Sequence, residues 1–155
     1  MLGGCGDDGD ETGTFPVVGE IAPAIAAVEA ELGAPQDYFE INATAQLVNL
    51  FVASDGESTA TAYVYLDGGL QPPAPPRGVA GGETFRADEV DFEPSLIFTG
   101  IAEELDDPTI TQFVVVAGAG DAVQYSAFVA SSAGGILDVL LGPDGSVLGV
   151  DPVSD

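Results

Sequence analysis

The chain of 155 residues contains no histidine, no lysine and no tryptophan, and it has a single cysteine. The absence of histidine excludes an ordinary Ser-His-Asp triad and the common zinc sites. Positive charge is confined to Arg77 and Arg86, which stand against 26 acidic residues and leave a formal net charge of −24. Because phosphate groups and anionic bilayers are bound through lysine and arginine, nucleic acid and electrostatic docking on a membrane are excluded.

The excess of carboxylates also determines the character of the surface. Two arginines cannot pair with 26 acidic side chains, and burial of an unpaired charge is costly, so most carboxylates are expected in solvent. Their mutual repulsion keeps molecules apart but opposes a compact fold. Salt at about 1 M shortens the Debye length to about 3 Å and relieves this repulsion, which suggests a salt-rich habitat. A basic protein, a cation or simply water remains as the counterpart of this surface.

No enzyme is expected from the residues that are present. Paired carboxylates can carry acid–base chemistry, but no spacing singles out a pair. The stretch Gly118-Ala119-Gly120 is followed by Val123, where a dinucleotide fingerprint needs its third glycine, and no helical pattern begins there. We therefore predict no catalytic residue and no cofactor.

A metal site is not predicted either. Asp7, Asp8, Asp10 and Glu11 lack the ligand spacing of a calcium loop, so a solvated segment is the expected structure there. A metal-dependent function is kept as an alternative. It would require calcium to stabilise the protein beyond the effect of matched ionic strength.

The motif Leu2-Gly3-Gly4-Cys5 resembles the bacterial lipobox, in which a branched apolar residue and two small residues precede a cysteine. In lipoproteins with that motif the cysteine becomes the lipidated first residue of the mature protein. The resemblance implies that Cys5 is the lipid attachment site, and that the protein is exported and anchored to the outer face of the bacterial cytoplasmic membrane. We expect a signal peptide upstream of the motif, and residues 1–14 as a lipobox remnant and acidic flexible tether.

Hydrophobic periodicity predicts two short helices and a series of strands. In residues 20–33 the apolar side chains recur on one helical stripe, and Gly33 is placed to end the helix. Residues 93–105 repeat this pattern, and Pro108 prevents its continuation. The expected strands cover residues 38–41, 47–53, 59–66, 112–117, 123–131, 136–141 and 147–150.

Short sequence motifs recur in the two halves of the chain in the same order. The tetrapeptide Phe-Val-Ala-Ser begins at residues 51 and 128, and Asp-Gly begins at residues 67 and 144, an offset of 77 in both cases (128 − 51 = 144 − 67). This order predicts an α+β fold of two tandem helix-plus-antiparallel-sheet (αβββ) units, with the helices packed on one face of the sheet. The units are expected at residues 15–70 and 85–155, joined by a Pro- and Gly-rich linker at residues 71–84.

A tandem αβββ unit resembles the PepSY-like and beta-lactamase-inhibitor-protein-like modules of bacterial secreted proteins. The stretch from Phe85 to Phe92, which leads into the second helix, is similar to small actinobacterial lipoproteins of that type. The resemblance covers most of residues 15–150. It implies a protein-binding or inhibitory role at the cell surface, and it implies no catalytic residues.

Alternation along residues 59–66 suggests where a partner binds. The alanine, valine and leucine side chains of this segment are expected beneath a helix, whereas Tyr63 and Tyr65 point to the opposite, wetter face. The shared Phe-Val-Ala-Ser register places Phe51 and Phe128 on that outer face as well. Exposed aromatic side chains are the usual anchors of protein interfaces, so these four residues form the candidate binding surface. The alternative is that the two repeats bury these aromatic residues against each other.

Together these features predict a monomeric, lipid-anchored surface protein without catalytic activity that binds another protein or a cell-envelope component, with inhibition as one possible outcome of binding. The alternative function is that of a carrier, which holds a small hydrophobic ligand or lipid between helix and sheet. A carrier requires a pocket with large apolar walls.

Overall fold

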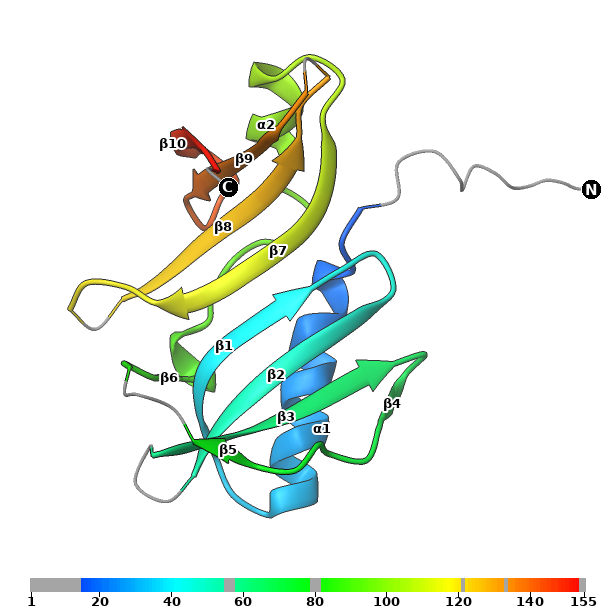
Figure 1. Ribbon diagram of the computed structural model, residues 1–155, viewed down its shortest axis with the longest axis vertical. Coiled ribbons are helices and arrows are strands. Elements are labelled where there is room, and N and C mark those ends of the chain that lie inside the picture. Colours follow the sequence, from blue (N-terminus) through cyan, green and yellow to red (C-terminus); the bar gives the residue numbers. More distant parts are fainter. Residues whose placement is uncertain (1–14, 55–57, 79–81, 121, 133, 154–155) are drawn as a thin grey trace, which may run out of the picture.

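The computed structural model describes residues 15–54, 58–78, 82–120, 122–132 and 134–153. Its strands form one antiparallel sheet in the order β10-β9-β8-β7-β1-β2-β3-β4, with β5 beside β3 and β6 beside β1 (Figure 1). The helical elements are η2 (Val18–Glu20), α1 (Ile21–Leu32), η3 (Ala87–Glu89) and α2 (Thr99–Glu104). The strands are β1 (Asp37–Ala43), β2 (Leu47–Ser54), β3 (Thr59–Leu66), β4 (Gly69–Leu70), β5 (Arg77–Gly78), β6 (Phe85–Arg86), β7 (Thr109–Ala117), β8 (Val123–Ala130), β9 (Ile136–Leu141) and β10 (Val147–Pro152).

The predicted strands are confirmed, because each of them coincides with a strand of the sheet to within a few residues. Alternating side chains and turn residues are local signals, and they suffice to place strand ends. Between β3 and β4, Asp67 and Gly68 both have positive φ angles, 54° and 78°. Two such residues in succession are what a type I′ hairpin turn requires.

The prediction of two helix-plus-sheet units is wrong, because the described residues form one large antiparallel sheet with one helix of ordinary length. The junction between the halves is a strand pair in which β1 lies beside β7, with Ile41 opposite Val115 and Ala43 opposite Phe113. β6 also pairs with β1. These pairings satisfy backbone groups that a separate first unit would leave open at its edge.

The second predicted helix, residues 93–105, is also wrong, because only the six residues of α2 are α-helical and residues 94–98 form turns. Leu96 and Ile97, in the turn part of this segment, pack directly against Gly145 in the β9–β10 turn, where an added Cβ would overlap the carbonyl oxygen of Leu96. Gly100, within α2, lies against the same turn. Close packing on this turn, which apolar spacing does not reveal, therefore determines the shape of the segment.

The first helix is confirmed, since α1 ends within one residue of both predicted limits. Gly33 adopts a left-handed conformation with φ 77°, and its N–H donates to the carbonyl oxygen of Glu29 at 2.8 Å. This is the usual way in which a glycine ends a helix. No helix in the part of the chain that the structure describes is long and apolar enough to cross a membrane.

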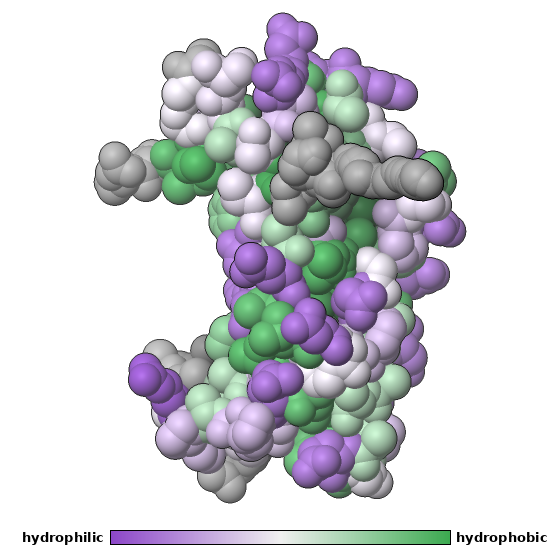
Figure 2. Space-filling view, turned by 90° about the vertical axis from the view of Figure 1, so that its right-hand side faces the viewer, coloured by the Kyte–Doolittle hydropathy of each residue, from purple (hydrophilic) through white to green (hydrophobic). Residues whose placement is uncertain are grey.

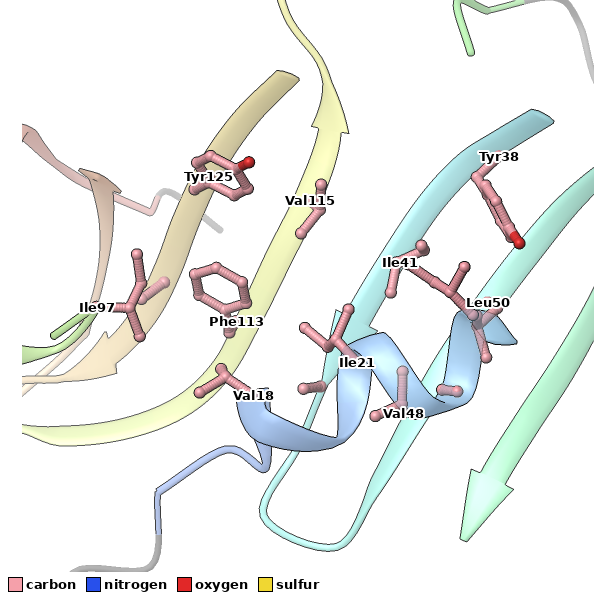
Figure 3. Packing of buried hydrophobic residues seen from close by; sticks show 14 of the residues in the cluster. Val18, Ile21, Tyr38, Ile41, Val48, Leu50, Ile97, Phe113, Val115 and Tyr125 are labelled. Atoms are coloured by element: carbon pink, nitrogen blue, oxygen red, sulfur yellow. The ribbon is translucent and has the colours of Figure 1, made fainter. Parts of the chain in front are cut away.

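One hydrophobic core lies along a single face of the sheet. α1 contributes Ile21, Ala24, Ile25 and Val28 to it. The strands beneath contribute side chains such as Ile41, Val48 and Leu50, which are fully buried (Figure 3). The same cluster continues through Ile97 and Phe113 in the second half. The segment around α2 thus occupies the place predicted for the second helix, residues 93–105.

Two tyrosine hydroxyls are hydrogen-bonded within this packing. Tyr38 Oη donates to Glu29 Oε2 at 3.0 Å, and the backbone N–H of Asp91 donates to Tyr125 Oη at 2.8 Å. Both tyrosines are buried, and burial raises the pKa of each phenol above its usual value near 10. The adjacent Glu29 carboxylate raises the pKa of Tyr38 further.

We expect the protein to lose stability as the pH rises above about 10. The phenols ionise near pH 10 in the unfolded chain but at higher pH in the folded chain. Above about pH 10 the folded state therefore binds more protons than the unfolded state does. The stabilising contribution is therefore complete below pH 10 and is lost as the pH approaches the folded-state pKa values. Urea unfolding at about pH 8 and about pH 11 measures the loss. The double variant Tyr38→Phe, Tyr125→Phe should show a smaller difference between these two conditions, and an unchanged difference would contradict the assignment.

Ion pairing contributes little to the described structure. Arg86 Nη1 lies 3.5 Å from Asp37 Oδ1, and both side chains are exposed. Such a pair contributes about 0 to 1 kcal/mol. The described residues form no second ion pair, so repulsion among the carboxylates is hardly offset.

We expect the melting temperature to rise as monovalent salt increases from about 0.01 M to about 1 M, because the Debye length falls from about 30 Å to about 3 Å. Screening removes more repulsion than attraction in a chain with a net charge of −24. Thermal unfolding followed by circular dichroism measures the effect. As a control, the rise should become smaller near the sequence isoelectric point of about 4.1. A flat or falling curve at neutral pH would show that carboxylate repulsion does not govern stability.

Candidate functional site

The face of the sheet opposite the core is the main candidate for a binding surface, and we refer to it as the open face. α1 and the segment around α2 both pack on the core face, as one cluster that contains Ile25 and Ile101 shows. In Figure 1 the strands β2 and β3 pass in front of α1, and no described helix lies on their other side. Functional side chains on the open face are therefore presented by strands alone.

Strand register arranges the open face into three rows that run across the sheet. The central row contains Leu140, Ser126, Val114, Asn42, Asn49 and Val64. The row on one side contains Gln124, Val116, Glu40, Phe51 and Ala62. The row on the other side contains Asp151, Asp138, Phe128 and Gln112. Apolar, amide and acidic side chains are thus mixed on this face.

The open face is curved. Asn42, Val114 and Ser126 are only 4%, 8% and 8% exposed, although no described helix covers them. Side chains of the flanking strands must therefore rise around the centre of the face. The space-filling view agrees with this, since the outline of the molecule is hollowed at the left of Figure 2.

A chain of side-chain hydrogen bonds crosses the centre of the open face. Asn49 Nδ2 donates to Asn42 Oδ1 at 2.8 Å, and Asn42 Nδ2 donates to Glu40 Oε1 at 2.7 Å. We call Glu40, Asn42 and Asn49 the polar ladder. Hydrogen bonds in a partly desolvated chain strengthen one another, and this chain ends on a carboxylate. The ladder therefore holds the Glu40 side chain in one position, directly across the strand pair from Phe51.

The two predicted phenylalanine anchors lie on the open face, and both are half-buried. Phe51 belongs to β2 and Phe128 to β8, which are three strand spacings apart, or about 14 Å. They also belong to different rows. They do not form one aromatic patch, and the ladder residue Asn42 lies in the row between them.

The predicted orientation of Tyr63 and Tyr65 is wrong. Tyr63 lies opposite Leu50 in the strand register and is only 6% exposed, and Tyr65 packs against the same core. Both therefore point toward α1. The residues that were expected under the helix, such as Ala62 and Val64, lie on the open face instead.

The packing around α1 accounts for this reversal. Tyr63 lies beside Leu32 at the end of α1, and Tyr65 lies beside Val17 just before the helix. The two rings therefore bury apolar surface at both ends of the helix, which the smaller alanine side chains of β3 would leave exposed. Tyr63 is consequently part of the core and not an interface anchor, and it does not support the alternative in which the repeats bury these aromatic residues against each other.

The remaining predicted sites lie outside the described residues. Cys5 and the acidic residues Asp7, Asp8, Asp10 and Glu11 belong to the segment before residue 15. Within the described part of the chain, no group of three or more Asp, Glu or Cys side chains is arranged to hold a metal ion.

Sequence reasoning missed the polar ladder. A signal for it exists, because Asn42 lies two residues after Glu40 in β1, and Asn49 is a polar residue within the apolar run of β2. A polar residue within a strand of an antiparallel sheet usually points to the face that is in contact with solvent. What the sequence does not reveal is that the two asparagines lie directly opposite each other.

Two apolar depressions occur at the surface away from the open face. One of about 310 Å³ lies between the start of α1 and residues 87–94, and includes Ile21, Val90 and Phe92. The other, of about 360 Å³, is lined by residues that include Phe15 and Phe98. Both lie at the junction of the two halves. A smaller depression of about 270 Å³ lies where the end of α1 meets β3 and β4, and its lining includes Leu32, Tyr63 and Leu70.

The chain matches no protein-family model, and comparison with curated proteins and with solved structures finds no match either.

Proposed function

We propose that this protein is an exported, lipid-anchored binding module without catalytic activity, and that its open face receives a basic segment of a partner protein. The observation that carries the proposal is the polar ladder, which fixes Glu40 beside Phe51 on a curved sheet face that no described helix covers. Fixed polar groups next to an aromatic ring are typical of the energetic centre of a protein interface.

The chemistry of this centre favours a lysine or arginine as the contacting residue. A cationic head group can pair with the Glu40 carboxylate, while its alkyl chain lies along the neighbouring Phe51 ring. Because the ladder holds Glu40 in place before binding, little side-chain entropy is lost when the pair forms.

The charge of the whole chain points to the same kind of partner. A net charge of −24 attracts a basic surface and repels an acidic one. Such attraction mainly raises the association rate and selects the partner, whereas contacts at the centre of the interface determine how long the complex lasts. A basic protein is therefore the expected partner.

Affinity capture from native cell envelopes, with the purified protein as bait, tests the proposal. We expect one basic protein to be retained by the wild type and released as salt increases from about 0.1 M to about 1 M, over which the Debye length falls from about 10 Å to about 3 Å. The double variant Glu40→Gln, Phe51→Ala should lose this protein.

A matched control uses the same two substitutions away from the open face. Glu103 is exposed on α2, and Phe15 is 48% exposed near the junction of the halves. The variant Glu103→Gln, Phe15→Ala should retain the partner as well as the wild type does. If the open-face variant retains it equally well, the open face is not the binding surface.

The lipid anchor is a separate part of the proposal and rests on the Leu2-Gly3-Gly4-Cys5 motif. Mass spectrometry of the protein isolated from its native cells tests it. The expected result is an N-terminal peptide that begins at Cys5 and carries acyl chains. An unmodified Cys5, or a mature N-terminus elsewhere, would contradict lipid anchoring without affecting the proposal for the open face.

The carrier function is less well supported. The space between α1 and the sheet is filled by fully buried side chains such as Val28, Val48 and Leu50. A ligand there would have to displace core residues. Native mass spectrometry of the purified protein should accordingly show no bound lipid.

A further inference from the structure

β10 forms one end of the sheet, and in the described structure it pairs with β9 alone (Figure 1). Just beyond β10, the N–H of Val153 donates to the carbonyl oxygen of Ile136 at 2.9 Å. Since successive residues of an antiparallel strand direct their backbone groups to opposite edges, Pro152 and Val150 face away from β9. Pro152 has no N–H and offers only its carbonyl oxygen. Val150 therefore presents both a backbone N–H and a backbone carbonyl oxygen at the open edge.

Exposed apolar side chains are concentrated at this edge. Of the seven large hydrophobic residues that are exposed in the described structure, four lie on β9, on β10 or just beyond it. They are Ile136, Leu148, Val150 and Val153. Leu148, at 63%, is the most exposed of the seven. Open edges are normally protected by charged side chains or by proline, and Pro152 and Asp151 provide such protection only at the end of β10.

The edge also carries two neighbouring carboxylates with no positive charge paired to them among the described residues. Asp138 on β9 and Asp151 on β10 lie directly opposite each other in the strand register. Like charges in this position destabilise a strand pair, and neither carboxylate has an ion pair with a described residue. An additional strand beside β10 would place one of its side chains next to Asp151, where a positive charge would relieve the repulsion.

We propose that the β10 edge binds an extended segment of a partner protein in which apolar residues alternate with lysine or arginine. The segment adds a strand to the sheet, pairs with the backbone of Val150, and places a cation beside Asp151. This mode of binding is known as β-augmentation. A second copy of the chain does not fit, because it would bring another net charge of −24 to the same edge. Asp151 and Asp138 lie at the end of one row of the open face, but the proposal does not depend on the polar ladder, on Phe51 or on Cys5.

A short synthetic peptide in which valine and lysine alternate is the probe for this site. We expect its titration to shift the amide resonances of β9 and β10 and to slow hydrogen exchange at Val150. A peptide with the same composition but with its lysines grouped together serves as the control for general attraction to an acidic protein. Equal binding of the two peptides, or shifts centred on Phe51 and Glu40, would overturn the proposal.

Variants of the edge give an independent test. Asp151→Asn should weaken binding of the alternating peptide by up to about fivefold, as expected for loss of one exposed ion pair. The control Asp67→Asn removes the same charge at the turn between β3 and β4 and should leave binding unchanged. Equal effects of the two substitutions would contradict a site at β10.

Val150→Pro removes the free backbone donor and should abolish strand addition. Leu148→Ser provides a second variant in case Val150→Pro disturbs the fold, because Leu148 is largely exposed and its replacement leaves the core intact. It should weaken the peptide complex while the melting temperature stays constant. Sedimentation without peptide completes the test, since a dimer that disappears in Leu148→Ser would show that the edge binds a second copy instead.

Discussion

Gly145→Ala is expected to lower the free energy of unfolding by about 3 kcal/mol or more. Gly145 has φ 89°, a conformation that is strained for alanine. A Cβ at this position would also overlap the carbonyl oxygen of Leu96 and lie 2.8 Å from the Leu96 carbonyl carbon. The turn between β9 and β10 can therefore pack against residues 96–97 only if position 145 has no side chain.

Gly149→Ala is the matched control within the same hairpin. Gly149 has no neighbour within 4 Å of an added Cβ, and its φ angle is not positive. Its replacement should change the unfolding free energy by less than about 1 kcal/mol. Urea unfolding of the two variants gives the comparison. Equal stability of both would show that the β9–β10 turn does not make the close contact described above.

Phe113→Ala is expected to lower the free energy of unfolding by about 3 to 5 kcal/mol, which is a large fraction of the stability of a typical domain. Phe113 is completely buried in β7. Its ring centroid lies 5.1 Å from that of Phe92, 5.9 Å from that of Phe98 and 6.0 Å from that of Tyr125. These rings fill the space beneath residues 92–98, where no long helix is present. Truncation would leave a cavity that the sheet cannot close.

Two further substitutions separate this effect from the loss of an aromatic ring in general. Phe113→Leu keeps much of the buried volume and should cost less than Phe113→Ala. Phe15→Ala removes a ring that stacks on Phe98 at 5.9 Å but is 48% exposed, so its cost should also be much smaller. Because β1 and β7 join the halves in one sheet, each variant should unfold in a single cooperative transition. Separate transitions for the two halves would contradict a common core.

The sequence predicts the local elements of this fold well and their assembly poorly. α1 and β3 follow from periodicity and from glycine at the turns, which act within a few residues. The pairing of β1 with β7 depends on contacts between distant segments, and no local pattern records it. Apolar spacing and Pro108 predict a helix at residues 93–105, whereas the packing of residues 96–97 against Gly145 decides the conformation of that segment.

For the candidate site, too, local features are predicted better than their arrangement in space. Alternation in β3 separates its side chains correctly into two sets, but it does not indicate which set faces the core. The choice depends on contacts with α1, where Tyr63 lies beside Leu32. For Phe51 and Phe128 the repeated tetrapeptide gives the correct face, and their separation across the sheet becomes visible only once β1 and β7 are paired. Lipidation of Cys5 remains a prediction from the lipobox motif.

The position of β1 in the middle of the sheet has a consequence for how the chain folds. Ile41 pairs with Val115, so 74 residues (115 − 41) separate the two partners. Closing so long a loop costs entropy before any contact is gained, and folding rates fall as such non-local contacts increase. During synthesis the first half emerges with one side of β1 uncovered, and β6 can shield only Asp37 and Tyr38. The arrival of β7 is therefore expected to be the slow step, and until then the bare side of β1 is the part of the nascent chain most prone to aggregate.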